Sequence, residues 1–191
     1  YHDIGYVKEN ISNHKFAEAG CSMSHIKLWH SLKYKLVNEN TWALILEDDA
    51  FLIGNTNKYL KEAWKILPKD VIQNGIIYLQ WCWPHDFGND LVIENKYVSI
   101  MKSKGYHGTT AYMINSKGLN RLLNIKIPLI ASLDRSIFTE MSNTHGIYGI
   151  KFKNIKSSNI FDSLEKDHKN SIVNMDINLN DGIIYGLSNI N

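Results

Sequence analysis

Residues 42–52, WALILEDDAFL, constrain the fold and chemistry of this chain more than any other stretch. The run begins with five apolar residues, Trp42–Leu46, which have the length and composition of a fully buried strand. Three consecutive carboxylates follow, Glu47, Asp48 and Asp49. Their charges repel one another, and an apolar surround disfavours each charged form further. The stretch therefore predicts either a cation site at a strand end or a solvated turn in which Asp49 caps a backbone N–H group.

The order of the carboxylates indicates which of them would share a cation. Alternation along an extended strand places Glu47 and Asp49 on one face and Asp48 on the other. Hard oxygen ligands of this kind suit Mg²⁺, Mn²⁺ or Ca²⁺. In open α/β sheets, ligands bind just beyond the carboxyl ends of strands, which is where these residues stand in the sequence.

Apolar runs and helical periodicities alternate along the chain, which favours a three-layer α/β domain spanning all 191 residues. The expected strands cover residues Trp42–Leu46, 75–81, 91–93, 97–101, 109–114 and Ile147–Phe152, with one more at 182–187. The expected helices run from a cap at Ser22 or Ser24 to residues 38–40, from 56 or 57 to 67, from 117 to 123 after a Ser116 cap, and from 133 to 141. The tail from residue 154 is expected to be mostly loop.

The composition excludes several classes of partner. The net charge of +2 arises from 21 basic and 19 acidic residues scattered along the chain, so no basic stripe supports a nucleic-acid partner or an anionic membrane surface. Cys21 and Cys82 are too few for a disulfide framework and lack metal-type spacing, which favours a reducing compartment such as the cytoplasm. The sequence shows neither a signal peptide nor an apolar run that could cross a bilayer.

Three segments carry a recognisable pattern when they are taken in order. Residues 20–25 read GCSMSH and precede Trp29, residues 43–49 read ALILEDD, and residues 108–114 read GTTAYMI before Gly118 and the pair Leu122-Leu123. In this order and at these separations they resemble glycosyltransferase family 25, which contains the bacterial lipooligosaccharide galactosyltransferases and the collagen β-galactosyltransferases. The resemblance covers about residues 15–140.

The resemblance implies a GT-A-like fold, a three-layer α/β/α arrangement with a mostly parallel central sheet. It implies an inverting transfer, in which galactose or glucose moves from a UDP-sugar donor to a glycan or hydroxylated protein acceptor. It also implies a divalent metal, usually Mn²⁺ with Mg²⁺ as the alternative, at a DxD-type motif whose place Glu47, Asp48 and Asp49 occupy here. Such a cation neutralises the charge that grows on a departing diphosphate. We assign Asp49 as the principal metal ligand, Glu47 as its assistant through the metal, a water or the donor ribose, and Asp48 to the donor side.

An inverting transfer needs a base that takes the proton from the acceptor hydroxyl. Asp134 stands where the family pattern has an acidic residue at the start of a helix, although an aspartate there also simply favours a helix N-terminus. Asp86 is the second candidate because it follows an expected strand, and the alternative is an ordinary loop aspartate.

Histidine and tryptophan side chains supply the remaining candidates. His25 is expected in the first turn of a helix, where it would contact the donor phosphate or else serve as an oriented structural partner. His107 would line the acceptor pocket or lie in a surface turn. Trp83 would stack on an acceptor sugar, although aromatic residues after a strand more often complete a core.

One departure from the family pattern bears on activity. Family members begin with a strand and an Arg-containing segment that help build the nucleotide pocket. No such strand is evident in residues 1–19, so the chain is expected to be either a fragment or a reduced homologue. Three functions stay open: an active glycosyltransferase, a non-catalytic carbohydrate- or protein-binding module, and a metal-dependent phosphohydrolase. The clustered carboxylates favour the first, the missing strand favours the second, and only His85 and Asp86 offer further ligands for the third.

Overall fold

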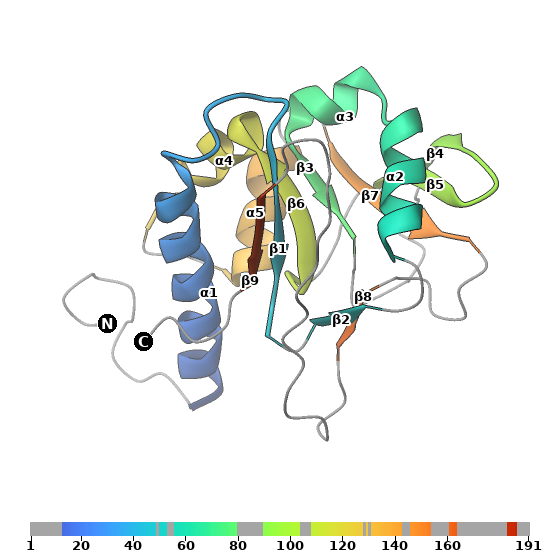
Figure 1. Ribbon diagram of the computed structural model, residues 1–191. Coiled ribbons are helices and arrows are strands. Elements are labelled where there is room, and N and C mark those ends of the chain that lie inside the picture. The colour runs from blue at the N-terminus through green and yellow to red at the C-terminus, as the bar shows by residue number, and fades with distance from the viewer. Residues whose placement is uncertain are drawn as a thin grey trace.

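A mixed β-sheet with helices on both sides forms the centre of the protein (Figure 1). The structure is a computed structural model, and it describes residues 13–48, 50–52, 56–79, 90–103, 108–127, 129, 131–142, 146–153, 161–163 and 183–186. The described helices are α1 (Asn13–Leu32), α2 (Thr56–Ile66), α3 (Lys69–Asn74), α4 (Ser116–Leu122) and α5 (Leu133–Ser142). The described strands are β1 (Trp42–Leu46), β2 (Ala50–Leu52), β3 (Ile76–Tyr78), β4 (Asp90–Glu94), β5 (Val98–Ser103), β6 (Ala111–Asn115), β7 (Ile147–Phe152), β8 (Phe161–Ser163) and β9 (Ile183–Gly186).

Within these ranges, seven strands form one sheet in the order β4-β5-β7-β3-β6-β1-β9, and β2 pairs separately with β8. β6 is antiparallel to both of its neighbours, and so is β5. The parallel pairs in the sheet are β1 with β9 and β3 with β7. The expected α/β class is confirmed, but the expectation of a mostly parallel sheet is wrong. β1 and β3 do point the same way, since both are antiparallel to β6, but β6 lies between them and makes both pairings antiparallel.

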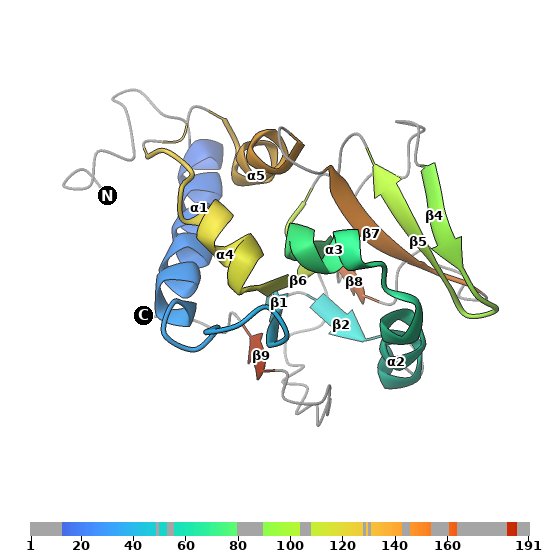
Figure 2. The same ribbon diagram turned by 90° about the horizontal axis from the view of Figure 1, so that it is seen from above.

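Alternate residues of β1 face two separate hydrophobic cores, which defines three layers. Ala43 and Ile45 pack in the core that contains buried residues of α1, α4 and α5. Trp42 and Leu44 pack in the core that contains buried residues of α2 and α3. Figure 2 shows α1, α4 and α5 on one side of the sheet and α2 on the other. Of the described helices, none has both the length and the apolarity needed to cross a lipid bilayer.

Helix α1 begins at Asn13, well before the expected cap at Ser22 or Ser24. The hydroxyls of the two serines donate to carbonyl oxygens four residues earlier, at 2.8 Å and 3.0 Å respectively. Such back-bonding is what a serine hydroxyl does inside a helix, where no free N–H group is available to cap. The cap prediction is therefore wrong, and His25 lies in the interior of α1 instead of its first turn.

Asn115 caps helix α4, whereas the sequence favoured Ser116. Its side-chain oxygen accepts from the backbone N–H groups of Lys117 and Gly118, at 2.9 Å and 3.2 Å. Its amide nitrogen donates to carbonyl oxygens of Glu39, before β1, and of α3. One fully buried side chain thus ties the end of β6 to the segments that precede two neighbouring strands.

Helix α1 also ends at Leu32 and not at the expected residues 38–40, whereas the other expected elements agree with the structure to within a few residues. β1 and β7 have the expected bounds, and β9 confirms the strand expected near the end of the tail. Helix α3 and the short pair of β2 with β8 were not expected.

Candidate active site at the end of β1

Glu47 follows the last residue of β1 and is fixed through its backbone. Its N–H group donates to the carbonyl oxygen of Thr110 at 2.9 Å, and its own carbonyl oxygen accepts from the N–H group of Ala50 at 3.1 Å. β1 ends at Leu46 and the chain turns back at Glu47, so strand alternation does not extend over Glu47, and the shared face of Glu47 and Asp49 stays a prediction. Asp48 lies in the turn and is exposed, whereas Asp49 lies outside the described residues.

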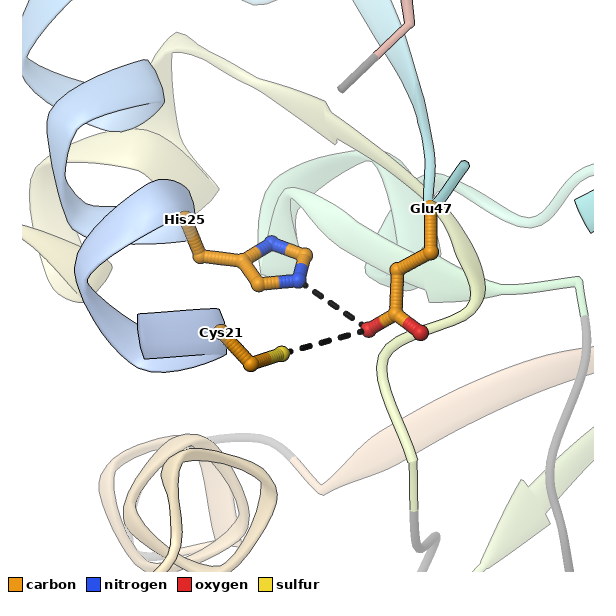
Figure 3. Close-up of side chains that lie close together, drawn as sticks. All are labelled: Cys21, His25 and Glu47. Carbon is orange, nitrogen blue, oxygen red and sulfur yellow. Dashed lines mark hydrogen bonds and ion pairs between the residues drawn. The ribbon is translucent and has the colours of Figure 1, made fainter. Parts of the chain in front are cut away.

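One carboxylate oxygen of Glu47, Oε1, accepts hydrogen bonds from three side chains. His25 Nε2 donates at 3.2 Å and the Cys21 thiol at 3.7 Å, both from α1. Thr109, just before β6, donates its hydroxyl to the same oxygen. Figure 3 shows His25 and Cys21 approaching this oxygen from α1, while the second carboxylate oxygen points away from them. The Glu47 carboxylate is therefore held in a fixed orientation.

His25 belongs to a buried series of hydrogen bonds between α1 and β6. The indole N–H of Trp29 donates to the Tyr112 hydroxyl oxygen at 2.9 Å, and the same hydroxyl lies 2.9 Å from His25 Nδ1. Since an ionised carboxylate only accepts, Nε2 facing Glu47 carries a hydrogen. Nδ1 then accepts from the Tyr112 hydroxyl, and an imidazole protonated on Nε2 alone satisfies every bond. The donors thus run in one direction, from Trp29 through Tyr112 and His25 to Glu47.

The surroundings of Glu47 act on its pKa in opposing directions. Burial raises the pKa of this carboxyl, but the hydrogen bonds from His25, Thr109 and Cys21 lower it, and together they hold the pKa below its ordinary value. The side chain remains 21% exposed. Burial also raises the pKa of Tyr112 well above its ordinary value, which keeps its hydroxyl hydrogen in place. Glu47 is thus a charged acceptor near neutral pH that solvent can still reach.

Asp134 contacts the same loop from α5. It stands in the first helical turn, as expected, and its Oδ2 accepts from the backbone N–H of Gly108 at 3.1 Å. Gly108 has a φ of 93°, a left-handed conformation that favours glycine. It directly precedes Thr109, whose hydroxyl binds Glu47. The loop before β6 therefore contacts two of the predicted carboxylates, and Asp134 has a structural contact that exists without any substrate.

Four of the predicted site residues lie outside the described residues: Asp49, Asp86, Trp83 and His107. Their assignments as metal ligand, base and acceptor contacts stay predictions.

The sequence-based prediction omits Cys21 and Thr109, which both contact Glu47. Cys21 and His25 stand four residues apart, a spacing that places two side chains on one face of a helix and that the sequence displays. The expectation that the cysteines lack metal-type spacing considers Cys21 only together with Cys82. The contact of Thr109 carries no local signal, because it joins positions 62 residues apart.

The region that contains this site matches a known protein family. Residues 5–137 match glycosyltransferase family 25, described as lipopolysaccharide biosynthesis proteins. A comparison with curated protein sequences finds no match. The matched region is more than half of the 191-residue chain, and it includes α1, the end of β1, the loop before β6 and the start of α5. The chain therefore belongs to glycosyltransferase family 25.

Proposed function

We propose that this protein is a metal-dependent inverting glycosyltransferase that moves galactose or glucose from a UDP-sugar donor to a glycan or hydroxylated protein acceptor. The observation that carries the proposal is the Glu47 carboxylate, which hydrogen bonds from α1 and from the loop before β6 hold in one orientation. Its position within the matched family region supports glycosyl transfer. Ligands of α/β sheets bind beyond strand ends of this kind.

The chemistry of the acidic residues fits a hard divalent ion, Mn²⁺ or Mg²⁺, because these ions prefer carboxylate oxygens. Oε1 of Glu47 is engaged by three donors, so the oxygen that points away from His25 and Cys21 is the one offered to such an ion (Figure 3). We assign Asp49 and Glu47 to hold the ion and Asp48 to contact the donor. When bound, the ion supplies the charge that neutralises the departing diphosphate.

The chain's own residues would handle the proton of the acceptor. In an inverting transfer, the acceptor oxygen bonds to the anomeric carbon from the face opposite the diphosphate, the sugar–phosphate bond breaks, and a base takes the hydroxyl proton. We assign Asp134 as this base because it binds the loop that also carries Thr109, with Asp86 as the second candidate. Trp83 and His107 would contact the acceptor sugar.

We assign His25 to the orientation of Glu47 and not to contact with the donor phosphate. Its side chain is fully buried, and both ring nitrogens are engaged within the protein. A hydrogen bond from such a ring restricts the carboxylate to one geometry, which is how a positioning residue supports a site.

One observation favours a second function. Three protein donors satisfy Glu47 Oε1, so this carboxylate stabilises the fold even where no metal binds. That arrangement also suits a non-catalytic homologue that binds carbohydrate or protein.

Isothermal titration of UDP into the protein, with and without Mn²⁺, tests the proposal. We expect UDP to bind only in the presence of Mn²⁺ and Asp49→Asn to weaken this binding by about tenfold or more. Asp70→Asn is the matched control, because Asp70 is an exposed aspartate on α3, at the opposite end of the sheet from the end of β1 (Figure 1). Wild-type protein that binds no UDP with Mn²⁺ would favour the non-catalytic module.

A further inference from the structure

We propose that Cys21, His25 and Glu47 form a zinc site, in addition to the Mn²⁺ position proposed above. A thiol, an imidazole and a carboxylate meet where α1 passes the end of β1 (Figure 3). Their ligand atoms all lie within 4.8 Å of one another. The site is defined by these residues alone and does not depend on transferase activity.

The distances between the ligand atoms suit a tetrahedral ion. Zn²⁺ binds nitrogen and oxygen at about 2.0–2.2 Å and sulfur at about 2.3 Å, so ligands of one tetrahedral ion lie about 3.3–3.7 Å apart. His25 Nε2 lies 3.2 Å from Glu47 Oε1, and Cys21 Sγ lies 3.7 Å from the same oxygen. Two edges of the tetrahedron therefore already have a suitable length, and the third pair, the sulfur and the nitrogen, lies within 4.8 Å.

Helix α1 supplies two ligands from one face, because Cys21 and His25 stand four residues apart. Their exposures differ: Cys21 is exposed, whereas the His25 side chain is fully buried. An ion would thus enter past Cys21 and keep one coordination position for water. Three protein ligands with one open position are typical of zinc sites that retain a solvent ligand.

Tyr112 provides the outer contact that orients a metal-bound histidine, which usually donates its other ring N–H to a neighbouring acceptor. On binding, the imidazole hydrogen moves from Nε2 to Nδ1 of His25, and Nε2 gives its lone pair to the ion. The Tyr112 hydroxyl hydrogen turns away, and its oxygen, with two lone pairs, accepts from both Nδ1 and Trp29. The Cys21 thiol loses its proton to solvent, so one Zn²⁺ ion enters as one proton leaves.

The mixture of ligands selects the ion. A thiolate beside an imidazole favours Zn²⁺ over hard ions such as Mn²⁺ and Mg²⁺. Asp48 and Asp49 offer only oxygen, which favours the hard ions instead. The two proposed positions are therefore distinguished by ligand chemistry, although both use Glu47.

Titration of Zn²⁺ into the full metal-free chain, in competition with a chromophoric chelator and without nucleotide, tests the site. We expect one ion to bind with release of one proton, read from the dependence of the binding heat on the ionisation enthalpy of the buffer. Cys21→Ser, a change at an exposed position, should weaken Zn²⁺ binding by about tenfold or more. Cys82→Ser removes the other thiol of the chain and is the matched control, expected to bind Zn²⁺ as wild type does.

A second readout reports the ligand atom directly. Co²⁺ bound in place of Zn²⁺ should give a thiolate-to-metal charge-transfer absorption that Cys21→Ser abolishes and Cys82→Ser retains. Equal Zn²⁺ affinity in wild type and Cys21→Ser, or loss of the absorption only in Cys82→Ser, would overturn the proposal. Neither readout uses nucleotide or Mn²⁺, so their failure is distinguishable from failure of UDP binding.

Discussion

The Tyr112 hydroxyl lies between two buried side chains, and both hydrogen bond to it. It accepts from the indole N–H of Trp29 and donates to Nδ1 of His25, at positions that are closed to solvent. Through His25 it also affects Glu47, which stands on a different element. The orientation of the carboxylate thus rests on a residue two hydrogen bonds away.

We expect Tyr112→Phe to lower the free energy of unfolding by about 1–3 kcal/mol, because it leaves buried polar groups of Trp29 and His25 without this partner. Urea denaturation followed by tryptophan fluorescence measures the change. Tyr34→Phe is the control, since Tyr34 is 82% exposed and its loss should change stability by less than about 0.5 kcal/mol. Equal unfolding free energies for both variants would contradict the buried network.

Thr109→Val removes the hydroxyl that binds Glu47 while nearly conserving the shape of the side chain. We expect the Mn²⁺-dependent affinity for UDP to fall about fivefold, equivalent to about 1 kcal/mol, because the carboxylate is less firmly oriented. Thr109→Ser keeps the hydroxyl and should keep the affinity. The hydroxyl has no orienting role if the valine and serine variants bind UDP equally well in the same titration.

At the scale of whole elements, α3 and α4 approach each other through two glycines. A Cβ atom at Gly118 would lie 1.9 Å from the carbonyl oxygen of Gly75. Gly75 has a φ of 82° where it caps the C-terminus of α3. Because the atoms that this Cβ would meet are backbone atoms of Gly75, no side-chain movement makes room for a larger residue at position 118.

Gly118→Ala is therefore expected to lower the free energy of unfolding by about 3 kcal/mol, the upper part of the usual range for overpacking. Gly20→Ala in α1 is the opposite case, since its Cβ would meet nothing within 4 Å and alanine favours a helix by about 0.5–1 kcal/mol. Chemical denaturation of the two variants should thus give shifts of opposite sign. An unchanged or raised free energy of unfolding in Gly118→Ala would show that the α3–α4 contact can widen to accept a methyl group.

The hairpin of β4 and β5 has an ionic contact near its turn. The Glu94 carboxylate accepts from Lys153 Nζ at 2.6 Å and from the Ser99 hydroxyl at 3.0 Å. These hydrogen bonds, the one from Lys153 first, hold the pKa of Glu94 below its ordinary value. A group whose pKa is lowered on folding stabilises the fold above its unfolded-state pKa and loses that contribution as the pH falls through its folded-state pKa.

We expect wild type to lose more stability than Glu94→Gln as the pH falls from neutral to below 4.5, the ordinary pKa of this carboxyl. Urea midpoints at a series of pH values measure the difference. Glu18→Gln, at an exposed position of α1, serves as the control for removal of one carboxylate. Superimposable pH profiles for wild type and Glu94→Gln would contradict a stabilising role for the contact.

The sequence predicts the bounds of some elements accurately and misses those of others, and the difference depends on how much of each element is buried. β1 has the expected bounds because it is a short apolar run between Thr41 and Glu47, and β7 has them because its residues are buried except for Lys151. The first turns of α1 were not expected as helix because Phe16, Ala17 and Glu18 are exposed. Since no side chain at these three positions is buried, they do not show the apolar periodicity that identifies a helix in a sequence.

At the scale of the whole molecule, neither the order of the strands in the sheet nor the set of residues around Glu47 can be predicted from local sequence patterns. The alternation of strands and helices predicts that β1 and β3 share a direction, and they do, but nothing local shows that β6 lies between them. Glu47 was predicted as a site residue from its neighbours in the sequence, an apolar run followed by two more carboxylates. Its hydrogen-bond partners stand 22, 26 and 62 residues away, and only the tertiary fold brings them together.

Strand β9 joins the sheet as a parallel neighbour of β1, with residues 43–46 paired to residues 183–186. We expect a chain that ends after residue 181 to unfold at lower urea concentration and to aggregate as the protein concentration rises. Such a chain lacks β9, so the backbone edge of β1 is exposed. A chain that ends after residue 186 keeps the strand and is the control. Light scattering and urea denaturation compare the two, and identical behaviour would show that this pairing contributes nothing.

The position of β6 between β1 and β3 also governs when the protein can assemble during translation. Among the described strands, β1 pairs with β6 and β9, whose residues are synthesised long after residues 42–46 leave the ribosome. Pairings between such distant positions make folding slow. The apolar residues of β1 therefore lack their strand partners until β6 is synthesised, and we expect the nascent chain to be prone to aggregation during that interval. The acidic stretch is made early, but it reaches its final surroundings only after the loop before β6 has emerged.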